Sequence, residues 1–219
     1  MKALPHNTNP CIQVPLYHPG PATCFATFRL AGSLPAHIER DLLENQHACR
    51  EILARLAGGI PQNGVCADEE LTCLEEFDRQ LMKHRSGPEW LGQTSLAALV
   101  ADELKRKDGE EYDLFAYCIM PNHVHCVIDT GRFHGEEQFA PRSISAVKRH
   151  TAHEANAVLG RTGFFWDHDH LQYPVGSSDI LHRILWNILS DPVRSGLCAS
   201  WRDWPWSYCR PGFLLARTV

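Results

Sequence analysis

The stretch that decides the fold is CIMPNHVHCVIDT, residues 118–130. Two runs of strand-forming residues lie on either side of the turn-forming Pro121 and Asn122, which predicts two strands joined by a short turn. In the second run, His123 and His125 are separated by Val124 alone. Side chains alternate across a strand, so we expect both imidazoles on one face, close enough to share one ion.

The sequence on both sides of this stretch predicts an alternation of strands and helices. Strands are expected where strand-forming residues lie between turn signals, at 23–32, 111–120, 123–130 and 164–175. Helices are expected where apolar residues recur at helical spacing, at 33–59, 95–109, 143–160 and 177–191. The last helix is predicted to stop before Pro192, and residues 131–142 are predicted to form a loop.

This order of elements predicts an α+β fold. Its natural closure is a ferredoxin-like antiparallel sheet with helices mainly on one face, plus a mainly helical insertion. One domain is expected at 23–208, with the insertion at about 60–92. An irregular N-terminal arm, residues 1–22, precedes this domain, and a C-terminal tail, residues 209–219, follows it.

The composition is that of an ordinary soluble protein, with 219 residues of which 44% are hydrophobic and 21% charged. No apolar run approaches the roughly 20 residues that span a bilayer, and the N-terminus lacks the apolar core of a signal peptide. Nine cysteines without a C-x-x-C pair are interpreted as reduced thiols of a cytoplasmic protein. The net charge of −5 argues against indiscriminate coating of nucleic acid but is compatible with a local basic groove.

A His-x-His pair by itself is more often a packing or surface feature than a metal site. A third ligand is therefore needed, and the last predicted helix offers Asp179, His182, Asn187 and, at its end, Asp191. Asn187 lies four residues before it, on the same helix face. One carboxylate oxygen and two imidazoles would suit Mg²⁺ or Mn²⁺. The alternative is that Asp191 only ends the helix before Pro192.

Several motifs together resemble the REP-associated tyrosine transposases, relatives of the HUH-class single-strand transposases. These motifs are PNHVH at 121–125, the helix and following segment at 143–166, and ILSDPVRSGL at 188–197. TFRLAGSLP at 27–35 and WRDWPWSY at 201–208 fit the same pattern. The resemblance covers most of residues 23–208 and is weakest at 60–92.

The resemblance implies a ferredoxin-like enzyme that binds hairpin DNA and cuts the single strand beside it. In that family, two histidines and an Asn or Gln hold a metal ion, and a tyrosine attacks the phosphate and stays linked to the DNA 5′ end. His123 and His125 match the metal histidines, and Asp191 stands at the position of the usual Asn. Lys148 matches a helix lysine that could contact phosphate, although it could equally be a solvated lysine.

The chain departs from the family at the nucleophile. Asn187 occupies the position of the tyrosine, and an asparagine cannot attack a phosphodiester. Among the five tyrosines, Tyr173 is the least unlikely substitute, because it lies on the segment leading into the last helix.

Three interpretations remain open at this point. The first is a domesticated or decayed transposase that still binds single-stranded or hairpin DNA at a metal-dependent site. The second is an active single-strand endonuclease that uses water or a displaced tyrosine, and the third is a non-catalytic protein-interaction module. Contacts with DNA phosphates are expected from five basic residues: Lys148, Arg149, Lys105, Arg106 and Lys107. The alternative for the three at 105–107 is that they only stabilise the C-terminus of the second predicted helix, where positive charge is favourable. The family also implies a possible homodimer.

Overall fold

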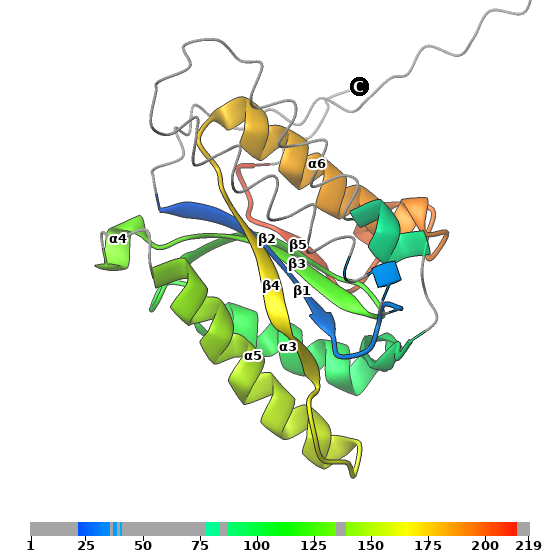
Figure 1. Ribbon diagram of the computed structural model, residues 1–219. Helices are drawn as coiled ribbons and strands as arrows, with labels where there is room; N and C mark the ends of the chain where they lie inside the picture. The colour runs from blue at the N-terminus through cyan, green and yellow to red at the C-terminus, as the bar shows by residue number, and fades with distance from the viewer. Residues whose placement is uncertain are drawn as a thin grey trace, which may run out of the picture.

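A five-stranded antiparallel sheet forms the centre of the molecule in the computed structural model, which describes residues 22–35, 37–38, 40, 78–83, 87–134 and 139–213 (Figure 1). The strand order is β4-β1-β3-β2-β5. The strands are β1 Thr23–Leu30, β2 Asp113–Ile119, β3 His123–Asp129, β4 Trp166–Pro174 and β5 Ser207–Cys209. The first four strands follow the ferredoxin-like plan, which confirms the predicted α+β class. The strand that carries HVH is therefore the central one.

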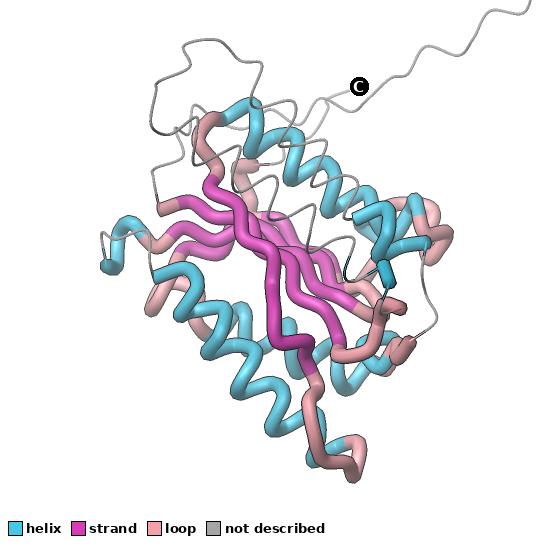
Figure 2. Tube along the Cα trace, in the orientation of Figure 1, coloured by secondary structure: helices cyan, strands magenta, loops and turns pink. Residues whose placement is uncertain are grey.

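Helices cover both faces of this sheet (Figure 2). Two long helices, α3 Thr94–Arg106 and α5 Phe139–Val158, lie on one face, and α6 Ser178–Arg194 lies on the other. The sequence predicted helices mainly on one face; α3 and α5 follow that expectation, and α6 adds a layer opposite them. The shorter helices are α4 Gly131–His134, η1 Trp90–Gly92 and η2 Trp201–Asp203. No helix within the described ranges is long and apolar enough to cross a membrane.

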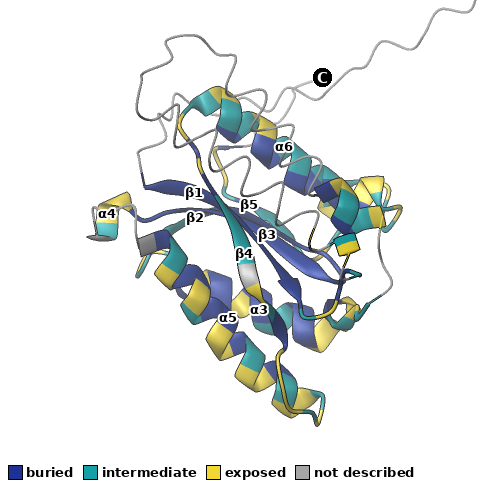
Figure 3. Ribbon diagram, viewed as in Figure 1, coloured by how far each residue is buried: buried dark blue, intermediate teal, exposed yellow. Residues whose placement is uncertain are grey.

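The three layers arise because β1 and β3 are buried on both faces (Figure 3). Alternate residues of β1 such as Ala26 and Phe28 pack with apolar residues of α3 and α5. Phe25 packs on the opposite face, in a second apolar cluster to which α6 contributes. A strand whose two faces are both buried can place polar side chains inside the protein only where partners exist for them.

The end of α6 differs from the prediction, because the helix does not stop before Pro192 but continues to Arg194. The fixed φ of proline, about −65°, is compatible with a helix, and the lost N–H bond and the crowding by the ring fall in the last turn, two residues before the helix ends. The last turn is held by bonds from Ser195 N to Asp191 O and from Leu197 N to Pro192 O, both of 2.8 Å. Asp191 is therefore a buried residue of the helix and not its end.

Other boundaries also differ from the sequence prediction. The predicted loop at 131–142 contains α4 and the start of α5, whose first turn tolerates Pro141. The aromatic segment near the C-terminus contains β5, a strand that was not predicted and that pairs with β2. Within the predicted insertion, residues 78–83 are helical. The arm at 1–21, most of the predicted helix at 33–59, and the ranges 60–77, 84–86 and 214–219 lie outside the described residues.

The described cysteines are free thiols, at Cys24, Cys118, Cys126, Cys198 and Cys209. Burial raises the pKa of Cys24 and of Cys209 to about 12. These buried groups therefore remain neutral, protonated thiols near pH 7, in keeping with the reduced state predicted from the sequence.

Phe28 provides a direct test of the packing on the α3 and α5 face. Its side chain is fully buried, and its ring meets Trp166 edge to face with centroids 4.8 Å apart. We expect Phe28→Ala to lower the free energy of unfolding by about 3–5 kcal/mol, because the contacts are lost and a cavity remains. Urea denaturation measures this change. Val158→Ala, at a residue 59% exposed, is the control and should stay within about 0.5 kcal/mol; equal effects would contradict the described core.

Candidate metal centre

Three buried side chains from β3 and α6 converge between the sheet and the helix. His123 and His125 point to the same face of β3, as strand alternation predicted, and their ring centroids are 4.6 Å apart. Asp191 approaches from α6. One candidate ligand atom from each of the three residues lies within 4.8 Å of the others. The structure thus brings together the three residues that the sequence predicted as metal ligands.

Helical periodicity places Asp191 over the sheet. The side chain of Ser177 caps α6 by accepting a hydrogen bond from the backbone N–H of Ile180. Ile184 and Ile188 lie on the buried stripe of the helix. Asp191 follows Ile188 by three residues and therefore falls on that same stripe. A carboxylate on an apolar stripe needs specific partners, since burial of an unpaired charge is costly.

Asn122 fixes the orientation of His123. Its Oδ1 lies 2.7 Å from Nδ1 of His123, and its Nδ2 donates to the carbonyl of Leu81 at 3.3 Å. Because the amide donates through Nδ2 on one side, Oδ1 is the acceptor on the other, and Nδ1 of His123 carries the proton. The lone pair of the ring is then on Nε2, which is the arrangement that metal-binding histidines adopt when a neighbour holds their other nitrogen.

Thr27 holds His125 in a similar way. Its hydroxyl oxygen lies 2.8 Å from Nδ1 of His125, across the β1–β3 pair. On the far side of the ring, Nε2 lies 3.3 Å from Oδ2 of Asp191 and 3.6 Å from Oδ1 of Asp78. Two carboxylates from different parts of the chain therefore approach one imidazole nitrogen.

The arrangement fits a divalent metal ion. Nε2 of His125 and Oδ2 of Asp191 are buried atoms that make no hydrogen bond within the described residues. Two ligand atoms that are each about 2.1 Å from an ion lie about 3.0 Å apart at a right angle and about 3.4 Å apart at a tetrahedral angle. The observed 3.3 Å between these atoms falls in this range.

Electrostatics also favour a cation at this point. Burial lowers the pKa of the His125 imidazole, but the carboxylates of Asp78 and Asp191 outweigh burial, so this pKa lies above its ordinary value. Arg194 forms an ion pair with Oδ1 of Asp191, which leaves Oδ2 facing His125. The two carboxylates therefore favour a positive charge at Nε2, whether from a proton or from a metal ion.

Asp78 and Asn122 were not identified as site residues from the sequence. Asp78 belongs to the region predicted as an insertion, and no motif or periodicity connects it to HVH. Asn122 was interpreted only as part of a turn. Its position directly before His123 is a signal that could have been used, because a side-chain amide beside a metal-binding histidine can hold the other ring nitrogen.

Neither of the two candidate positions for the nucleophile, residue 187 and Tyr173, brings a tyrosine to the candidate metal centre. Asn187 lies one turn before Asp191 on α6 and is partly exposed, and its carbonyl accepts a hydrogen bond from Arg194. Tyr173 is buried on β4, where it pairs with Phe25. In the sheet order, β1 and the Phe25 ring separate Tyr173 from β3.

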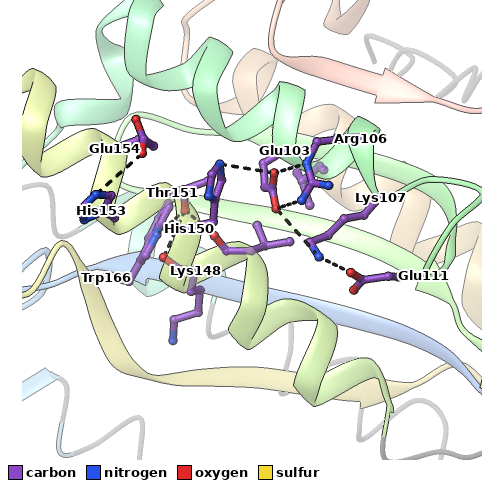
Figure 4. Close-up of polar contacts among 12 residues, drawn as sticks. Glu103, Arg106, Lys107, Glu111, Lys148, His150, Thr151, His153, Glu154 and Trp166 are labelled. Atoms are coloured by element: carbon purple, nitrogen blue, oxygen red, sulfur yellow. Dashed lines mark hydrogen bonds and ion pairs between the residues drawn. The ribbon is translucent and has the colours of Figure 1, made fainter.

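The predicted phosphate contacts lie on α3, at its C-cap and on α5, in the helix layer opposite α6. Figure 4 shows three of them, Arg106, Lys107 and Lys148. Lys148 is largely buried and donates to the carbonyl of His168 at 3.1 Å, whereas Arg149 is exposed. Arg106 makes two hydrogen bonds of 2.8 Å to Glu103. Lys107 is buried and pairs with Glu111, and Lys105 is exposed beside the Tyr117 ring. Contact with DNA stays a prediction for all five basic residues.

Comparisons with known proteins add one structural similarity. No protein-family model matches the chain, and no curated protein matches it. A solved structure of a REP-associated tyrosine transposase bound to a REP hairpin is similar, with a TM-score of 0.46 and 14% sequence identity, over 94% of this chain and 93% of that chain.

Thr27→Val tests the support of His125. Valine has nearly the shape of threonine but leaves the buried Nδ1 of His125 without its hydrogen-bond partner. We expect the free energy of unfolding to fall by about 1–3 kcal/mol, measured by urea denaturation without added metal. Thr162→Val, at an exposed loop residue, is the matched control and should change stability little; an equally small effect at Thr27 would show that this hydroxyl does not support the imidazole.

Proposed function

We propose that the protein is a transposase-type DNA-binding protein that binds single-stranded or hairpin DNA at a metal-dependent site and lacks the tyrosine nucleophile. The observation that carries the proposal is the convergence of His123, His125 and Asp191, all buried, between β3 and α6. The histidines belong to a PNHVH motif on the central strand, and this motif resembles the metal site of the REP-associated tyrosine transposases.

The donor set supports Mg²⁺ or Mn²⁺ as the ion. The carboxylate of Asp191 is a hard oxygen ligand, and imidazole also binds Mn²⁺. When bound, such an ion can polarise a phosphate oxygen as a Lewis acid. The residues of the chain hold the ligands in place: Asn122 orients His123, Thr27 orients His125, and Arg194 holds one oxygen of Asp191.

The position of the basic residues suggests how DNA would lie on the protein. Arg149 and Lys105 are exposed on the α3 and α5 layer, whereas the metal ligands face α6. If basic residues on α3 and α5 contacted the phosphates of a hairpin stem, the single-stranded flank would have to run around the edge of the sheet to reach the metal ligands. Stem binding and metal binding would then be carried by separate residues.

Asn187 argues against the family's covalent chemistry. Its amide is not a nucleophile, and Tyr173 is two strands away from β3, a separation of about 10 Å. Side chains stand roughly perpendicular to a sheet, so the register does not bring the Tyr173 ring onto His125. The proposal is therefore a protein that keeps the binding functions without the tyrosine-dependent step.

The DNA-binding part of the proposal is tested by fluorescence anisotropy with a labelled hairpin that carries single-stranded flanks. We expect tighter binding to this hairpin than to a random duplex of equal length, and weaker binding as salt rises. Arg149→Ala should lower the slope of log K against log salt by about one unit. Arg202→Ala, an exposed arginine outside α3 and α5, is the control. Equal affinity for the random duplex, or binding that is independent of salt, would count against the proposal.

The loss of the nucleophile is tested by incubating the protein with the flanked hairpin and Mn²⁺, followed by a denaturing gel. The unaltered chain should form no covalent protein–DNA adduct. Asn187→Tyr should gain a 5′-linked adduct, because the phenol would lie one turn from Asp191, whereas Asn187→Phe lacks the hydroxyl and should not. An adduct of the unaltered chain, mapped to Tyr173 or to another tyrosine, would overturn this part of the proposal.

A further inference from the structure

We infer that the carboxylate of Asp78, beside His125 but outside the three ligands, raises the affinity of the metal centre for a divalent cation. This inference rests on the proposed metal site and extends it to a residue of the region predicted as an insertion. The region would thus contribute directly to the site in addition to its contribution to packing.

The contact that places Asp78 is its distance from His125. Oδ1 of Asp78 lies 3.6 Å from Nε2 of His125, and both side chains are buried. The same nitrogen lies 3.3 Å from Oδ2 of Asp191. An ion bound to Nε2 would therefore have two carboxylates nearby, one from α6 and one from the helical residues at 78–83.

Three contacts fix the segment that carries Asp78. The carbonyl of Leu81 accepts a hydrogen bond from Asn122, the residue that also orients His123. The Leu81 side chain is fully buried against Leu34, which follows β1. Gly87 lies so close to Gly32 that a Cβ on it would be 2.1 Å from the Gly32 carbonyl oxygen. The segment is thus held beside the start of β3, which Asn122 precedes, and beside the end of β1, which Gly32 and Leu34 follow.

The negative charge of the Asp78 carboxylate is what would raise the affinity for a divalent cation. Oδ1 of Asp78 and Oδ2 of Asp191 both approach Nε2 of His125, and Arg194 pairs with only one oxygen of Asp191. Hard divalent cations bind more tightly as the number of carboxylates around them increases. Groups that support metal ligands from outside typically change metal affinity about 10–100-fold when they are removed.

A structural role for Asp78 predicts something different. If Asp78 served only to pair with a protonated His125, removing its charge would lower the stability of the protein and leave Mn²⁺ affinity nearly unchanged. Metal affinity and thermal stability therefore have to be measured on the same variants.

The experiment is isothermal titration calorimetry of the full chain with MnCl₂, together with the melting temperature with and without Mn²⁺. We expect one Mn²⁺ site in the unaltered protein, about 10–100-fold weaker binding in Asp78→Asn, and recovery of most of the affinity in Asp78→Glu. Asp78→Ser removes the same charge and serves if Asp78→Asn does not fold. Glu103→Gln, at a buried acid on α3 with its own ion pairs, is the matched control and should bind as the unaltered chain does (Figure 4).

The outcomes separate the two claims. If the unaltered chain binds no Mn²⁺, the proposed metal site itself is wrong. If the unaltered chain binds Mn²⁺ and the charge-removing variants at Asp78 bind within twofold of it, the metal site stands and the inference about Asp78 is overturned. A Mn²⁺-induced rise in melting temperature that is lost in Asp78→Asn but kept in Asp78→Glu and Glu103→Gln supports the inference.

Discussion

The burial of His125 between the central strand and α6 is the constraint on which the rest of the site depends. An imidazole enclosed on all sides needs a partner for each nitrogen. Thr27 serves Nδ1, and the carboxylates of Asp191 and Asp78 surround Nε2. The contacts of the His125 ring thus connect β3 to β1, to α6 and to the segment at 78–83. Phe25 stacks against the same ring with centroids 5.7 Å apart and closes the site on the side toward β4.

The sequence predicted the parts of the site that depend on local periodicity. Strand alternation placed His123 and His125 on one face, and the resemblance to the transposase family singled out Asp191 among the candidates on the last helix. The partners that come from elsewhere in the chain were not predictable in this way: Thr27 reaches His125 through strand register, and Asp78 through the packing of Leu81. Periodicity also cannot say which face of a sheet a helix covers, which is why the place of α6 opposite α3 and α5 had to come from the structure.

The residue at position 187 bears on the proposed chemistry but not on the packing of α6. Asn187 is only partly exposed on α6, but the buried stripe of that helix is formed by neighbouring apolar residues such as Ile184 and Ile188. At such a position tyrosine and asparagine would both leave the stripe intact, and of the two only tyrosine offers a nucleophile. The ligands are held by other residues, so the proposed metal-binding and DNA-binding functions do not require a tyrosine at 187.

The measurement that tests the central claim most directly is anomalous diffraction from crystals of the unaltered protein grown with Mn²⁺. The account predicts one anomalous peak between β3 and α6, about 2.0–2.3 Å from Nε2 of His123, Nε2 of His125 and Oδ2 of Asp191. A peak at another place, or a structure in which Nε2 of His125 is bonded directly to a carboxylate at saturating Mn²⁺, would contradict it.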